Sequence, residues 1–211
     1  MIQSLIILFG LTMLYVGSMS RVESYIKALA VQGVILFLIV IIDYGTENIA
    51  NMLLLSAETL VVKAILIPLV LIKVVRKNGI HRELEPYIPD FFSLLITSII
   101  FALGFYITYW MSDVSGTVRP FYFGVSISTL VTGFFVIMTR KKIITHVMGY
   151  MLIENGIFLL ALSIAKEMPF IVAMGVLLDI FMAVYIFGLF VNKIQDVFTE
   201  IKIDNLSNLK D

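Results

Sequence analysis

Four ionisable side chains occur inside long apolar stretches of this sequence, and their types and positions could carry chemistry. They are three acids and one base, Glu58, Lys63, Glu154 and Asp179. A charged side chain at the centre of a bilayer costs about 2.5–3.5 kcal/mol or more, so we expect these groups to face a helix interface, internal water or another subunit. Burial disfavours the charged form of a carboxyl, and such a group can exchange protons near physiological pH, as a proton path requires.

Glu58 and Lys63 are five residues apart in one apolar stretch. Five residues of an α-helix turn by about 500°, so the two side chains project about 140° apart and do not stack. We therefore expect each of them to pair with another helix or subunit rather than with the other. Glu154 and Asp179 fall at similar depths on consecutive apolar stretches, which allows a shared site between them.

A purely structural role is the alternative for these four residues, because polar side chains also hold membrane helices together. His146 follows the basic run Arg140-Lys141-Lys142. It is either a solvated residue at the membrane interface or a point where protons enter from the cytoplasm. Pro68 predicts a kink in its helix, which would free a backbone carbonyl for water or a partner.

The composition excludes most cofactor chemistry from this chain. There is no cysteine, and the only histidines are His81 and His146, so we expect no iron–sulfur, haem or zinc site, no cofactor and no metal. The formal net charge of zero gives no field that would attract nucleic acid. With 60% hydrophobic and only 14% charged residues, the chain is expected in the lipid bilayer.

Seven stretches are apolar enough to cross a bilayer core, which needs about 20 helical residues. They are residues 1–18, 28–44, 52–75, 91–111, 120–139, 143–165 and 168–191. Backbone groups in lipid must be satisfied within each segment, so we expect an all-α integral membrane protein of about seven transmembrane helices. Twelve basic residues fall on one side of this arrangement and two, Arg119 and Lys166, on the other. The positive-inside rule then predicts a multi-pass protein of the cytoplasmic (inner) membrane, with the N-terminus out and the C-terminus in.

The sequence also predicts an internal repeat. Gln32-Gly33 precedes Glu58 by about the same distance as Asn155-Gly156 precedes Asp179. We expect two parallel three-helix repeats, spans 1–3 and 5–7, with the fourth span as a spacer helix. Residues 1–90 are expected to form a first three-helix unit with a cytoplasmic linker, and residues 91–119 the spacer with an outer loop. Residues 120–193 are expected to form the second three-helix unit, and residues 194–211 a cytoplasmic tail.

The second unit carries a family resemblance. It resembles the K subunit of complex I (NADH-quinone oxidoreductase) and its counterpart in multisubunit sodium/proton antiporters, through the runs GFFVIMTRKK at 133–142 and GYMLIENG at 149–156. Asp179 resembles another buried glutamate of that family. Two departures are clear, because the family's usual acid position falls on Met151 rather than Glu154, and aspartate replaces glutamate at 179. As a whole, the chain is similar to the hydrogenase-4 component E family, which belongs to group 4 nickel–iron hydrogenase and formate hydrogenlyase complexes.

This resemblance implies a non-catalytic membrane subunit, without its own redox centre, of a proton-translocating oxidoreductase complex. The implied partners are antiporter-like and heel-type membrane subunits together with peripheral hydrogenase and iron–sulfur subunits. Glu154 and Asp179, with Glu58 and Lys63, would contribute to the proton path. Two alternatives stay open: a subunit of a multisubunit cation/proton antiporter or related transporter, and a structural membrane adaptor whose buried charges only bind its neighbours.

Overall fold

The computed structural model describes residues 1–19, 21–44, 49–77, 87–112 and 118–164, all within the compact unit Met1–Val176. The regular elements of these residues are all helical, as the sequence predicts. They are α1 (Ile2–Ser18), α2 (Val22–Tyr44), α3 (Ile49–Ala57), the π-helix η1 (Glu58–Leu66), α4 (Ile67–Lys77), α5 (Asp90–Ser112), α6 (Pro120–Thr139) and α7 (Ile143–Ile164).

Five helical segments of the described chain are long and apolar enough to cross a membrane. They are Val22–Asp43, Leu55–Lys73, Asp90–Met111, Pro120–Thr139 and Ile144–Ile164, which correspond to the expected second to sixth spans. The first expected span forms the apolar helix α1, which at 17 residues is shorter. The seventh, residues 168–191, lies outside the described residues. The multi-pass character is confirmed, whereas the count of seven spans stays a prediction.

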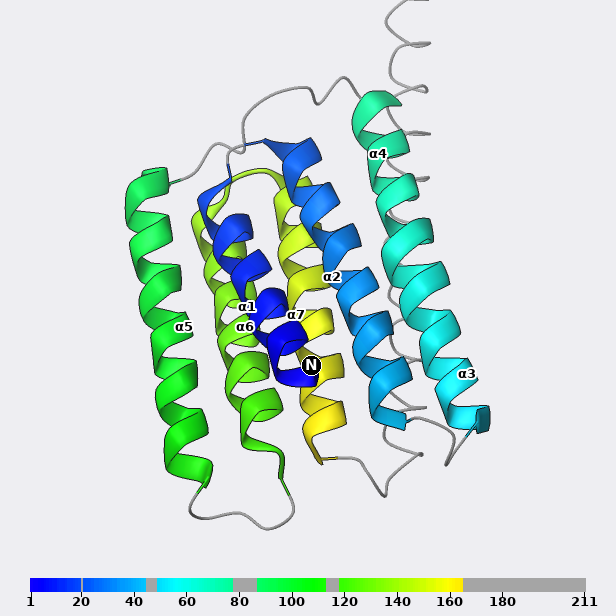
Figure 1. Ribbon diagram of the computed structural model, residues 1–211. Helices are drawn as coiled ribbons and strands as arrows, with labels where there is room; N and C mark the ends of the chain where they lie inside the picture. Colours follow the sequence, from blue (N-terminus) through cyan, green and yellow to red (C-terminus); the bar gives the residue numbers. More distant parts are fainter. Residues whose placement is uncertain (20, 45–48, 78–86, 113–117, 165–211) are drawn as a thin grey trace, which may run out of the picture. The chain divides into compact units, whose positions relative to one another are not determined.

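The helices run in alternating directions, with α5 at one edge and the α3–η1–α4 segment at the other (Figure 1). Helix α5 packs on α1 and α6, α7 packs on α6 and α2, and η1 packs on α2. The spacer helix therefore contacts one helix of each expected repeat. The α1–α6 and α2–α7 contacts join helices that the repeat makes equivalent. Because the last helix of the second unit lies outside the described residues, the repeat itself stays a prediction.

Helix α5 is held by a close backbone contact with α6. A Cβ added at Gly104 would overlap the hydroxyl group of Ser128 and lie 2.6 Å from the carbonyl oxygen of Gly124. Gly124 in turn lies against Thr108, so each helix presents a glycine and a small hydroxyl residue four positions later. Small residues at this spacing let membrane helices approach closely, where van der Waals packing is the main attraction between them.

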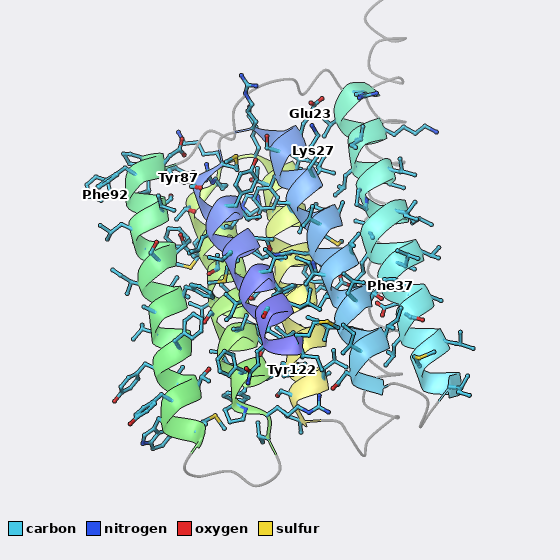
Figure 2. The ribbon with its side chains drawn as sticks, viewed as in Figure 1. Glu23, Lys27, Phe37, Tyr87, Phe92 and Tyr122 are labelled. Carbon is cyan, nitrogen blue, oxygen red and sulfur yellow. The ribbon has the colours of Figure 1, made fainter. Side chains whose placement is uncertain are left out.

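Charged residues mark the two ends of the described helices. At one end, Arg119 binds both carboxylate oxygens of Asp43 and stacks on the ring of Tyr122. Figure 2 shows Tyr122 far from Lys27 and Tyr87, which lie at the other end. Burial lowers the pKa of Arg119, but the hydrogen bonds and charge of Asp43 outweigh it and leave that pKa raised above its ordinary value. Which of the two ends faces the cytoplasm stays a prediction.

Arg140 lies at the opposite end, and it is buried rather than solvated like an ordinary residue of a basic turn. Only 2% of it is exposed; Nη2 donates to the carbonyl oxygen of Gly17 at 3.3 Å, and Nη1 lies 3.7 Å from Oδ1 of Asp90. Burial lowers the pKa of the guanidinium from its ordinary value, and the charge of Asp90 opposes that shift. Arg140 thus ties α6 to the ends of α1 and α5.

Candidate functional site between α2, η1 and α7

Glu58 and Lys63 form an ion pair within their own helix, and the prediction that they do not is wrong. The Nζ of Lys63 lies 3.6 Å from Oε1 of Glu58, and the two residues are 4% and 5% exposed. The prediction assumed α-helical winding, but Glu58–Leu66 is a π-helix. Its i→i+5 hydrogen bonds bring residues five apart onto nearly the same face, so the pair can form.

The π-helix ends directly before the Ile67-Pro68 dipeptide. The backbone N–H of Ile67 donates to the carbonyl oxygen of Val62, five residues earlier. In an α-helix, Pro68 would have no N–H for the carbonyl of Ala64 and its ring would clash with that group. The kink expected at Pro68 stays a prediction, but the winding changes from π-helical to α-helical directly on its N-terminal side. π-Helical turns of this kind occur often at functional sites.

Gly33 of α2 allows η1 to lie directly against the α2 backbone. A Cβ at this position would come within 2.7 Å of the backbone nitrogen of Ala64 and within 2.9 Å of the carbonyl carbon of Lys63. Any larger residue would push the two helices apart, because the obstructing atoms belong to backbone and cannot rotate away. The glycine therefore places its neighbour, Gln32, beside the segment that carries the ion pair.

Two buried amides join α2 to α7. Nδ2 of Asn155 donates to Oε1 of Gln32 at 3.1 Å, and the two residues are 4% and 0% exposed. These are the same two amides that the expected repeat makes equivalent. The sequence marked Gln32 as part of that repeat but not as a site residue, although it is an amide in the middle of an apolar span.

Helix α7 reaches the ion pair through an aromatic ring. The Nζ of Lys63 lies 4.8 Å from the centroid of the Phe158 ring, a distance at which a cation is attracted to the ring face. Glu154 is four residues before Phe158, so the two side chains share one face of α7. Glu154 is only 3% exposed. The structure thus brings Glu58, Lys63 and the acid-bearing face of α7 into one buried region.

Side chains at intervals of four residues wind along α7 from its N-terminal end to this region, each turned by about 40° from the one before it. They are His146, Tyr150, Glu154 and Phe158. His146 is half-buried, and its ring Nδ1 lies 3.0 Å from the carbonyl oxygen of Lys142. At 1.5 Å per residue, His146 is about 12 Å along the axis from Glu154, with Tyr150 between them. The four-residue spacing was visible in the sequence, but Tyr150 was not predicted as a site residue.

The remaining predicted site residue, Asp179, lies outside the described residues, so its proximity to Glu154 stays a prediction. Among the described residues, no group of three or more His, Cys, Asp or Glu side chains could hold a metal ion. The polar groups described at this site are carboxyls, an ammonium group and amides, which can exchange protons or orient hydrogen bonds.

Comparison with known proteins identifies distant relatives. The chain is 25% identical over 190 residues to an uncharacterized protein of Mycobacterium tuberculosis, covering 90% of this chain and 86% of that protein. It is 25% identical over 161 residues to hydrogenase-4 component E of Escherichia coli K12 and of Shigella flexneri, covering 76% of this chain and 74% of each relative. No family model and no solved structure matches the chain. The chain is thus a distant relative of hydrogenase-4 component E, and the resemblance to the K subunit of complex I stays a prediction.

Proposed function

We propose that this chain is a non-catalytic membrane subunit of a proton-translocating, complex I-related hydrogenase of the hydrogenase-4 or formate hydrogenlyase type. In this role it contributes Glu58, Lys63, Glu154 and Asp179 to the path of the translocated proton. Its partners would be antiporter-like and heel-type membrane subunits, with the hydrogenase and iron–sulfur chemistry carried by peripheral subunits.

The observation that carries this proposal is the buried meeting of α2, η1 and α7. An ammonium group 3.6 Å from a carboxylate can shift the proton affinity of that carboxylate when either one moves or changes charge. We further propose that the proton reaches Glu154 before the Glu58–Lys63 pair, because His146 and Tyr150 lie between one end of α7 and Glu154. The distant relationship to hydrogenase-4 component E supports the assignment to a hydrogenase complex rather than to another oxidoreductase.

Co-purification tests the assembly part of the proposal. The protein is extracted in mild detergent through a C-terminal tag, and the proteins that accompany it are identified. We expect nickel–iron hydrogenase, iron–sulfur and antiporter-like subunits. Antiporter-like subunits alone, together with transport driven by an imposed ion gradient in the absence of any electron donor, would contradict this and favour the antiporter alternative.

Glu154→Gln tests the proton path itself. In inverted membrane vesicles, we expect the proton uptake per hydrogen molecule turned over to fall by at least about tenfold, because the amide cannot exchange a proton. Hydrogen oxidation with an artificial electron acceptor should stay at the wild-type rate. Glu23→Gln is the matched control, since Glu23 is exposed in the first turn of α2. Wild-type proton uptake in Glu154→Gln would remove Glu154 from the path.

A further inference from the structure

Gln32 has a hydrogen-bonding group that the described part of the protein does not satisfy. Its side chain is completely buried, its Oε1 accepts from Asn155, and its Nε2 has no hydrogen-bond partner among the described residues. A buried amide N–H₂ group without a partner is costly, and unsatisfied groups of this kind in folded proteins are commonly met by an ordered water molecule.

Gln32 belongs to a helix whose backbone contacts η1 at the next residue, and its own side chain contacts α7. Through Gly33, the α2 backbone is in contact with Lys63 and Ala64 of η1. Through its own side chain, Gln32 is bonded to Asn155, the residue directly after Glu154 on α7. Lys63 also reaches over Phe158 of α7, so the three helices converge at this depth.

We propose that Gln32 is a positioning residue that holds a water molecule between the Glu58–Lys63 pair and α7. This inference rests on the proposed function and adds a further residue to the same proton path. A buried water needs two to four polar partners, and the Gln32 N–H₂ group supplies one donor to its oxygen. The oxygen accepts from Gln32 with one lone pair, which leaves its second lone pair to accept from a carboxylic acid and its hydrogens to donate to acceptors such as a buried carboxylate.

The water, rather than the amide, passes the proton. A proton arriving from a carboxylic acid on one side binds the water oxygen, and a different hydrogen leaves for a carboxylate on the other side. One O–H bond forms and another breaks at the water, while Gln32 keeps both of its amide hydrogens. The amide therefore acts by fixing the position and orientation of the water, and it does not itself carry charge.

Gln32→Leu tests the proposal in the intact complex, because leucine keeps most of the volume and removes the donor. Two quantities are measured: proton uptake per hydrogen turned over, and the infrared O–H band of internal water, identified by its shift in H₂¹⁸O. We expect the proton uptake ratio to fall about tenfold and a wild-type water band to be absent. Gln3→Leu is the matched control, since Gln3 is exposed near the start of α1, and this variant should keep the wild-type proton uptake ratio and the water band. A wild-type water band in Gln32→Leu would overturn the proposal.

An exchange of the two amides separates this role from a structural one. The variant Gln32→Asn with Asn155→Gln keeps an amide pair of the same total length, so the link between α2 and α7 and the assembly should persist. The shorter side chain at position 32 withdraws the donor from the water, and we expect a shifted water band and a lowered proton uptake ratio. Wild-type behaviour in this double variant would reduce Gln32 to a structural residue.

The same measurements distinguish failure of this inference from failure of the proposed function. If Glu154→Gln retains full coupling, Glu154 is removed from the proposed proton path, while the water band still reports directly on Gln32. If Glu154→Gln loses coupling and Gln32→Leu keeps it, only the role of Gln32 is wrong.

Discussion

Lys63→Met removes the positive partner of a carboxylate that is only 5% exposed, and its cost follows from the geometry of the pair. At the 3.6 Å separation and an effective dielectric constant of about 20, the attraction between Lys63 and Glu58 is about 4–5 kcal/mol. Removing one member of a buried pair typically costs about 3–5 kcal/mol, because the other charge is left uncompensated. Glu58→Gln in the same background removes that stranded charge. We therefore expect the double variant to be more stable than Lys63→Met alone, with a coupling energy of about 1–3 kcal/mol.

The assay is thermal denaturation of the detergent-extracted protein, followed by the recovery of folded material on size-exclusion chromatography. For a chain of this length, a loss of about 3 kcal/mol corresponds to a decrease in Tm of about 6–12 °C. Lys27→Met is the matched control, because Lys27 is exposed near the start of α2 and should lower Tm by little. Losses that simply add in the double variant would refute the ion pair, and with it the π-helical winding that brings the two residues together.

Two further predictions concern the contacts that hold the helices in place. Gly104→Leu should detach α5 from α6 and sharply reduce the yield of assembled protein on size-exclusion chromatography. Leu103→Ala, on the exposed face of α5, should leave that yield unchanged. Equal yields from the two variants would contradict the close contact between the helices. Arg140→Met should destabilise the protein by about 2–3 kcal/mol in the same thermal assay, because a charged hydrogen bond is lost at a buried position. Arg140→Lys should not restore the loss, since a lysine lacks the fork that reaches Gly17 and Asp90 together.

Much of the fold followed from properties that belong to each segment separately. Apolar length predicts a membrane helix because a bilayer leaves the backbone no partner except itself. The second to sixth spans were therefore found correctly, although α2 begins at Val22 rather than at residue 28. Glu58, Lys63 and Glu154 are buried, as expected, since exposure of a charge to lipid is costly wherever the span lies, whereas Asp179 lies outside the described residues.

Pairing could not be predicted in the same way, because it depends on winding and on contacts between distant residues. The spacing of Glu58 and Lys63 excluded an ion pair only under α-helical geometry, and the π-helix reversed that conclusion. Arg140 looked like a residue of a basic turn, yet the ends of α1 and α5 enclose it.

The sequence by itself thus determined that this is a helical, multi-pass membrane protein with buried acids, since hydropathy and charge act locally along the chain. Only the tertiary structure decided that Gln32 meets Asn155 across 123 positions of sequence and that Lys63 lies over Phe158. Such contacts depend on how closely two backbones approach. Between α2 and η1 that approach is set by Gly33, whose missing side chain matters only once the two helices are packed together.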